Sequence, residues 1–367
     1  MPSPVTELLR DWHGGDETAR ERGGHTLQLI RRHRVGVAAG AGLLVAVLGV
    51  GVAIGPLDVE LPREGVRAGR ERNAKMAESW NAAALLAQEA GDLAEAEASY
   101  REALTLRRTA FGDLHPDVVK NLDNLGLVLW SRGWYGESEK TLSEALTLRR
   151  QLLGPESLEV ADGLNHLALP LEAQGDFVRA ESLHREALDL WTKRLGDRHP
   201  QVATGLHNLG IDLLEQGRAA EAEPFLRQGL ALRRELLGDD HPEVAQSLVK
   251  LALATLASHD FAAAEALASE SLILNRKLFG EEHAAVAGSL RILAQARQGR
   301  GDRAGAETLL RQRLAMLRKL LGSANPEVAS ALKDLADLLA ASGDLAAGEA
   351  AAGEAAQILR RALPVNG

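Results

Sequence analysis

Apolar residues recur along this chain at helical spacing, in blocks that short polar turns interrupt. In the segment LDNLGLVLWSRGWYGESEKTLSEALTLRRQLLG, Leu125 and Leu129 precede Gly133, and Leu142 and Leu146 follow it. Residues three or four positions apart lie on one face of a helix, so each block predicts an amphipathic helix. Glycine suits the turn between the blocks, because a chain leaving a helix commonly needs the left-handed conformation that glycine adopts at low cost. The segment therefore predicts a helical hairpin.

This hairpin pattern recurs at a fixed interval of 42 residues. Seven copies align, and their first residues are Trp80, Leu122, Leu164, Leu206, Leu248, Leu290 and Leu332. Six of them close on a glycine: Gly112, Gly154, Gly196, Gly238, Gly280 and Gly322. A unit too small to bury its own apolar face stacks on its neighbours. The predicted fold class is therefore all-α, an α-solenoid of seven helical hairpins without a sheet.

Two columns of charged residues keep the same side chain in nearly every copy. The first consists of Glu97, Glu139, Glu181, Glu223, Glu265, Glu307 and Glu349. The second consists of Arg108, Arg150, Arg234, Arg276, Arg318 and Arg360, with Thr192 as its exception. A feature that all copies share indicates a structural role, so we expect these side chains to bond to neighbouring helices.

Two residues depart from the repeated pattern. His259 stands where six other copies have the turn glycine. Pro170 lies inside the first helix of the third copy, where it removes one helical hydrogen bond. We therefore expect that helix to bend or break.

Each copy resembles the tetratricopeptide repeat. The likeness rests on the turn glycine, a column of small side chains in the second helix, and Leu-Gly pairs at 125–126 and 209–210. The 42-residue period and the Asn-Leu-Gly triplets that begin at Asn124 and Asn208 are most similar to the long repeats of kinesin light chain and its bacterial relatives. The resemblance covers residues 76–364 and implies a right-handed superhelix whose first helices line a concave, ligand-binding surface.

Composition argues against several classes of function. The net charge of −9 makes nucleic acid an unexpected partner. The absence of cysteine excludes disulfides and thiolate chemistry. Phosphoryl transfer needs a glycine-rich phosphate loop, a His-Arg-Asp motif and an Asp-Phe-Gly motif, none of which the sequence contains. We therefore predict no enzyme, no catalytic residue and no cofactor.

Histidines recur in the loops between copies, at His115, His199, His241 and His283. Metal ligands must converge on one ion, whereas equivalent loops of stacked repeats lie a helix pair apart. We therefore expect each histidine to cap or pack its own loop, and we predict no metal site.

Residues 35–55, VGVAAGAGLLVAVLGVGVAIG, contain no charged side chain. A helix of this length measures about 31 Å, close to the hydrocarbon thickness of a bilayer. A transmembrane helix is thus predicted, in preference to a buried helix or a cleaved signal peptide. Three arginines precede it directly: Arg31, Arg32 and Arg34. They favour a cytoplasmic N-terminus and a periplasmic or extracellular repeat array. Two small-residue pairs permit a weak homodimer through this span: Gly36 with Gly40, and Gly51 with Gly55.

The first 34 residues resemble a fragment of another family. The stretches VTELLRDWHGGD, from Val5, and RGGHTLQ, from Arg22, are similar to the opening of a bacterial extracytoplasmic-function sigma factor, whose promoter-binding regions are missing here. A remnant stub, a chance match and a docking peptide remain open. The predicted organisation is a cytoplasmic stub (1–34), a transmembrane helix (35–55), a linker (56–75), the repeat array (76–364) and a tail (365–367).

Ligand binding in the tetratricopeptide family uses variable positions of the first helices. Asn124 and Asn208 match the family asparagine that holds a peptide backbone, because a carboxamide offers both a donor and an acceptor. One turn further on, an apolar strip comprises Leu85, Leu127, Leu169, Ile211 and Leu253. The predicted peptide-binding residues are Asn124, Trp130, Asn165, His166, His207, Asn208, Lys250 and Arg291. The alternative is that these residues belong to the interior or simply solvate the surface.

Together these patterns predict a membrane-anchored scaffold that binds a peptide or protein in the concave groove of its repeats. The arrangement of a basic run, one span and long repeats is also similar to the C-terminal arm of bacterial membrane serine/threonine kinases. The alternative function is therefore a regulatory or sensory arm that acts through a separate catalytic partner. A degenerate fusion without a retained role is a third possibility.

Overall fold

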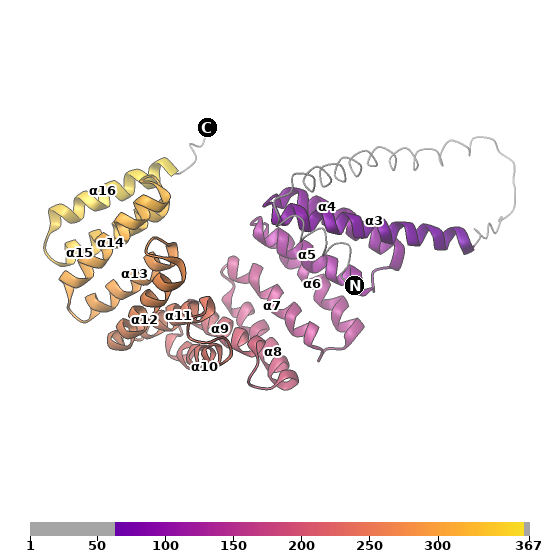
Figure 1. The fold of residues 1–367 in the computed structure, drawn as a ribbon, viewed down its shortest axis with the longest axis horizontal. Coiled ribbons are helices and arrows are strands. Elements are labelled where there is room, and N and C mark those ends of the chain that lie inside the picture. The colour runs from indigo at the N-terminus through magenta and orange to yellow at the C-terminus, as the bar shows by residue number, and fades with distance from the viewer. Residues whose placement is uncertain (1–62, 363–367) are drawn as a thin grey trace. The chain divides into compact units, whose positions relative to one another are not determined.

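The computed structural model of the chain describes residues 63–362. Within them every regular element is an α-helix, and 14 helices form seven successive hairpins (Figure 1). The hairpins are α3 (Arg63–Glu89) with α4 (Leu93–Phe111), α5 (Pro116–Ser131) with α6 (Tyr135–Leu153), α7 (Leu158–Ala173) with α8 (Phe177–Leu195), α9 (Pro200–Glu215) with α10 (Ala219–Leu237), α11 (Pro242–Ala257) with α12 (Phe261–Phe279), α13 (Ala284–Gly299) with α14 (Arg303–Leu321), and α15 (Pro326–Ala341) with α16 (Leu345–Ala362). The predicted all-α fold of seven hairpins is confirmed.

The chain divides into two compact units, of which the first ends at Gly112 and the second begins at Asp113. In the first unit α3 packs against α4. Helix α3 begins at Arg63, so the later part of the segment predicted as a linker is helical. Arginine, glutamate and alanine dominate that stretch, and all three favour helix. None of the helices between residues 63 and 362 is long and apolar enough to cross a membrane, and the predicted span 35–55 lies outside the described residues.

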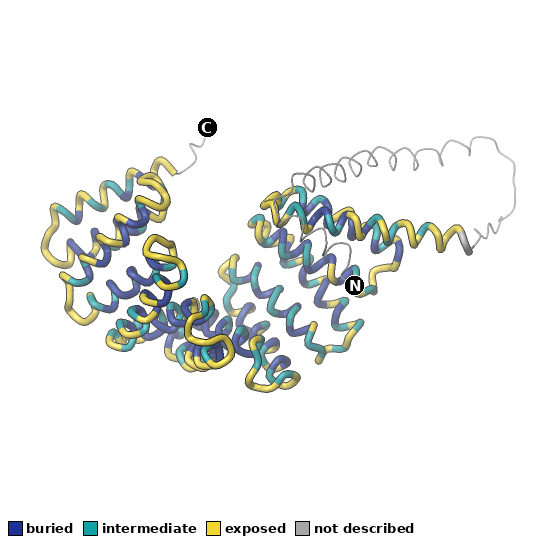
Figure 2. The backbone as a smooth tube through the Cα atoms, viewed as in Figure 1, coloured by how far each residue is buried: buried dark blue, intermediate teal, exposed yellow. Residues whose placement is uncertain are grey.

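In the second unit each helix packs against the next along the chain. Contacts between successive first helices (α5 with α7, α9 with α11, and α11 with α13) are more extensive than those between successive second helices. The first helices therefore line the inner side of the stack and the second helices its outer side. Figure 2 shows the buried positions on the facing sides of the hairpins, where leucine and alanine form the core.

The loop histidines cap their own helices, as predicted. Nδ1 of His115, in the extended conformation, accepts a hydrogen bond of 3.2 Å from the backbone N–H of Asp117. Proline follows in the first turn, where its missing N–H costs no helical bond. The same cap recurs at His199, His241 and His283, and Asn325 replaces it in the last loop.

The turn inside each hairpin is left-handed. His259 adopts φ 61° in the turn between α11 and α12, where the other hairpins place glycines with φ near 80°. Helix α7 continues through Pro170, so the helix does not break there, and the expected bend stays a prediction. Proline removes one backbone hydrogen bond, while the buried side chains of Leu167 and Leu171 keep the helix packed on both sides of it.

Several members of the two charged columns connect neighbouring hairpins, which confirms the prediction for those members. Glu139 accepts from Arg179 at 2.7 Å, and Arg150 donates to Glu186 at 2.6 Å. The same connections recur for Glu181, Glu265, Arg234 and Arg318. Glu223 and Glu307 instead bond to an arginine one turn along their own helix. Exposed pairs of this kind contribute little stability each, about 0–1 kcal/mol.

Candidate functional site

The inner helices bring two of the predicted binding residues into contact. Asn208 in α9 donates a hydrogen bond of 2.8 Å through Nδ2 to Oδ1 of Asn165 in α7. Both side chains are half-buried. This pair bridges the third and fourth hairpins on the inner side of the second unit.

The other predicted residues are distributed along the inner helices. Asn124 and Trp130 lie on α5, Lys250 on α11 and Arg291 on α13, all half-buried. Lys250 acts electrostatically on His207, and Arg291 acts on the buried Arg313 of α14. The structure therefore places Lys250 near His207, the chain neighbour of Asn208, whereas α5 and α13 carry their residues at other levels of the stack.

His166 and His207 lie deeper than a freely accessible ligand-binding side chain. Burial lowers the pKa of His166, and Arg149 lowers it further. Burial lowers the pKa of His207 from 6.5 to about 3, and the charges of Arg233 and Lys250 act in the same direction. No partner within the described chain bonds to Nδ1 of either ring. For His207 the structure favours the predicted alternative of an interior position.

The apolar strip of the second unit is half-buried along its length. Leu127, Leu169, Ile211 and Leu253 each expose part of their side chain on successive inner helices. In the first unit, Leu85 is 44% exposed. The strip thus keeps an accessible apolar edge beside the polar positions.

Sequence reasoning missed a column of large polar side chains that the second helices bury between hairpins. Buried Arg149 in α6 forms an ion pair with Asp123, and Arg233 in α10 donates to Ser247 Oγ at 2.7 Å. Each faces a small residue on the following helix; Gly163, for example, has no room for a Cβ beside Arg149. The sequence did carry a signal: a large side chain in one helix recurs together with a small residue 14 positions later. The pairs are Arg149 with Gly163, Trp191 with Gly205, Arg233 with Ser247, and Asn275 with Ser289.

A second missed feature is a buried cluster of Glu172, His184 and Asp212 where α7, α8 and α9 meet. His184 Nδ1 lies 2.6 Å from Asp212 Oδ2 and 3.8 Å from Glu172 Oε1. Burial raises the pKa of Glu172 to about 7, against the opposing charge of His184, and the charge of Asp212 and a hydrogen bond to it raise the pKa further. Its sequence signal was histidine and aspartate at positions where the other copies carry apolar residues.

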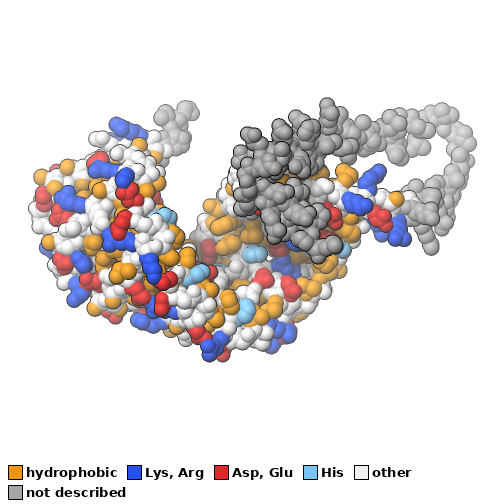
Figure 3. All heavy atoms as spheres, in the orientation of Figure 1, with side chains coloured by type: hydrophobic (Ala, Val, Ile, Leu, Met, Phe, Trp, Pro, Cys, Tyr) orange, Lys and Arg blue, Asp and Glu red, His pale blue; other side chains and the backbone are white. Residues whose placement is uncertain are grey.

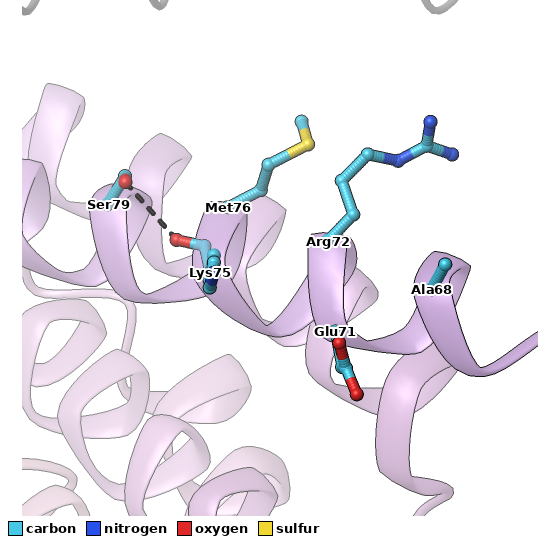
Figure 4. Close-up of a pocket in the computed structure, with 6 residues that line it drawn as sticks. All are labelled: Ala68, Glu71, Arg72, Lys75, Met76 and Ser79. Atoms are coloured by element: carbon cyan, nitrogen blue, oxygen red, sulfur yellow. Dashed lines mark hydrogen bonds between the residues drawn. The ribbon is translucent and has the colours of Figure 1, made fainter.

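Two pockets contain none of the predicted binding residues. Six side chains of α3 line one of them, and Figure 4 shows Ser79 Oγ donating to the Lys75 carbonyl. These side chains project from a single helix, so they do not converge on a ligand. A second pocket, of about 520 Å³, lies between α8, α9 and α10 and includes Phe225 and Gln228.

Comparison with known proteins agrees with this architecture. The family model described as tetratricopeptide repeat matches residues 75–151, 159–235, 220–272 and 243–319. The chain belongs to the tetratricopeptide repeat family. No curated protein matches it.

Several solved tetratricopeptide-like structures are similar to this chain. The nearly identical TPR-like repeats of a putative kinesin light chain from Podosopora anserina share 25% identity, with a TM-score of 0.50, over 56% of this chain and 98% of that one. BtubC (BKLC) from P. vanneervenii shares 24% identity, with a TM-score of 0.53, over 64% and 94%. The apo form of RapI shares 14% identity, with a TM-score of 0.62, over 77% and 97%. The last two likenesses concern the fold alone, and the sigma-factor and kinase-arm resemblances stay predictions.

Proposed function

We propose that the inner surface of the second unit binds an extended peptide, or an extended segment of a partner protein, and that the chain acts as a scaffold. The contact between Asn165 and Asn208 supports this most directly, because it places two carboxamides side by side. The half-buried Leu169 and Ile211 of the apolar strip follow one helical turn further along the same two helices. A peptide backbone needs both donors and acceptors, and its apolar side chains need apolar surface. This part of the tetratricopeptide array offers both.

The polar chemistry favours a main-chain ligand with acidic side chains. Asn208 uses one amide hydrogen for Asn165, and each carboxamide has further donor and acceptor capacity. Lys250 and Arg291 lie on the next two inner helices and would attract carboxylates. Figure 3 shows basic and acidic side chains interspersed over the helices of the second unit, so recognition would depend on individual positions.

A peptide library selected on the intact chain tests this proposal. Selected peptides are then titrated against the wild type, an Asn124→Ala/Asn208→Ala variant and a control variant, Gln228→Ala. Gln228 lines the pocket between α8, α9 and α10 and is not one of the predicted binding residues. The loss of one or two backbone hydrogen bonds should weaken binding about 10-fold or more in the double variant, with unchanged helicity and melting. Equal affinity in that variant, or a loss only in Gln228→Ala, would place the interface elsewhere.

We further propose that residues 35–55 anchor the chain in a membrane with the repeats outside the cytoplasm. The uncharged composition of this segment and the arginines before it support the proposal. The full chain should sediment with membranes after an alkaline wash and dissolve in detergent, whereas a chain lacking residues 35–55 should stay in the supernatant. Membrane association that survives the deletion would contradict the anchor.

A further inference from the structure

The cluster of Glu172, His184 and Asp212 joins three helices from two hairpins. Glu172 lies near the end of α7, His184 in α8 and Asp212 in α9. One ligand-type atom from each residue lies within 4.8 Å of the other two. His184 and Asp212 are completely buried, while 25% of the Glu172 side chain is exposed. The cluster therefore opens to solvent only on the side of Glu172.

The internal repeats show that the fold does not require these polar residues. Equivalent positions to His184 hold Leu142, Leu226, Ala268, Leu310 and Ala352 in the second unit, and in the first unit Tyr100, which bonds to Gln88. Equivalent positions to Asp212 hold Val128, Pro170, Ala254, Ala296 and Leu338. Buried polar groups cost stability unless they are fully bonded, and the same hairpin forms elsewhere with apolar residues. Polar replacements at adjoining positions in three neighbouring helices indicate a role other than packing.

The hydrogen bonds within the cluster are incomplete. Asp212 Oδ2 contacts His184 Nδ1, and Oδ1 has no hydrogen-bond partner in the described part of the chain. Among the described residues, the one other neighbouring group able to donate to the Asp212 carboxylate without an ion is the Glu172 carboxyl in its protonated form. His184 and, more weakly, Lys250 act on Glu172 as positive charges, and Lys250 is the only permanent cation among the described groups that act on it. The buried group thus has an excess of acceptor atoms that a cation would satisfy.

We propose that Glu172, His184 and Asp212 form a site for one divalent transition-metal ion, Zn²⁺ by the chemistry of the donor set. One imidazole nitrogen and two carboxylate oxygens are typical zinc ligands, whereas Ca²⁺ and Mg²⁺ prefer all-oxygen sites with more ligands. Zinc bonds of about 2.0–2.2 Å in a tetrahedral site separate the ligand atoms by about 3.4 Å. The His184–Asp212 and His184–Glu172 separations of 2.6 and 3.8 Å bracket this value. All three atoms lie within 4.8 Å of one another, so changes in their separations of about 1–1.5 Å are sufficient.

Binding requires a change of tautomer at His184 and the release of the proton that Glu172 carries at or below a pH of about 7. The proton between Nδ1 and Asp212 must leave Nδ1, and Nε2, which bonds to nothing else in residues 63–362, can carry it. The fourth coordination position then faces the exposed side of Glu172 and holds water. An ion here would crosslink the third and fourth hairpins beside the proposed groove, but the site does not depend on peptide binding.

Calorimetric titration of the EDTA-treated full chain with Zn²⁺ in mild detergent tests the site. We expect one equivalent to bind tightly, to raise the melting temperature, and to be replaceable by Co²⁺ with the visible absorption of a tetrahedral complex. His184→Leu and Asp212→Ala restore residues that other repeats carry, so both should fold with normal helicity. Each should weaken zinc affinity by more than about 100-fold, the upper range for losing an outer-shell partner.

The control is His241→Asn, which keeps a helix cap because Asn325 forms the same cap in the last loop. It should bind zinc as the wild type does, since the site contains no loop histidine. The proposal is overturned if the wild-type chain lacks a one-equivalent site, if His184→Leu or Asp212→Ala retains it, or if His241→Asn removes it. The first of these results would leave a buried triad held by hydrogen bonds alone.

Discussion

Acidification should destabilise the second unit through His207, a side chain buried on the inner side of α9. Its neighbours include two cations, Arg233 of α10 and Lys250 of α11, and burial itself opposes a charged ring. Together they lower the pKa of His207 from 6.5 in the unfolded chain to about 3 in the fold. The ring is therefore neutral in the folded protein at every pH above about 4.

The sign of the effect follows from proton binding. Between pH values of about 6.5 and 3 the unfolded chain binds a proton at this histidine that the folded chain does not, so stability falls as the pH falls. The contribution is fully present above the unfolded pKa and is lost as the pH approaches the folded value. With about 1.4 kcal/mol for each pKa unit, acidification from pH 8 to pH 5 should remove about 2 kcal/mol.

Urea unfolding followed by circular dichroism at several pH values measures this loss. The comparison is His207→Asn, because Asn165 occupies the equivalent position of the preceding repeat and does not titrate. Carboxylates and other histidines titrate in both proteins, so only the difference between them reports on His207. The wild type should lose about 2 kcal/mol more than the variant between pH 8 and pH 5.

Parallel pH profiles would refute this reasoning. Equal losses in the two proteins would mean that His207 accepts a proton in the fold without penalty. A smaller loss in the wild type would mean that a carboxylate stabilises the charged ring, contrary to its surroundings of Arg233 and Lys250.

Two further predictions concern the backbone of the repeats. Gly126→Ala should lower the free energy of unfolding in urea by about 1–2 kcal/mol, because the new Cβ would lie 2.5 Å from Leu142 Cγ. Gly288→Ala should raise it by up to about 1 kcal/mol, because nothing lies within 4 Å of the new Cβ. Similar effects at both sites would contradict the packing argument. His259→Gly should raise the melting temperature and increase the free energy of unfolding by about 0.5–1 kcal/mol, since φ 61° strains a residue with a Cβ. His259→Ala is the control, because it removes the imidazole and keeps the strain. An equal increase in both variants would attribute the effect to the lost imidazole.

The sequence alone determined the local architecture of this protein. Helix positions, turn glycines and histidine caps depend on residues within a few positions of one another. The helical pattern recurs in all seven copies, the turn glycine in six and the histidine cap in four loops. Helix α7 continues through Pro170 for a reason that is not local. Packing of Leu167 and Leu171 against neighbouring helices outweighs one lost hydrogen bond.

Only the tertiary structure decided which polar side chains meet. His184 and Asp212 are 28 residues apart, and Asn165 and Asn208 are 43 apart. Their contacts depend on how far each hairpin rotates against the next, which no single hairpin specifies. For the same reason, the sequence placed His207 on a binding surface, and the stack buries it beside Arg233. The repeat pattern defines the positions that face a neighbour, and the packing of adjacent hairpins determines the partner that each one finds.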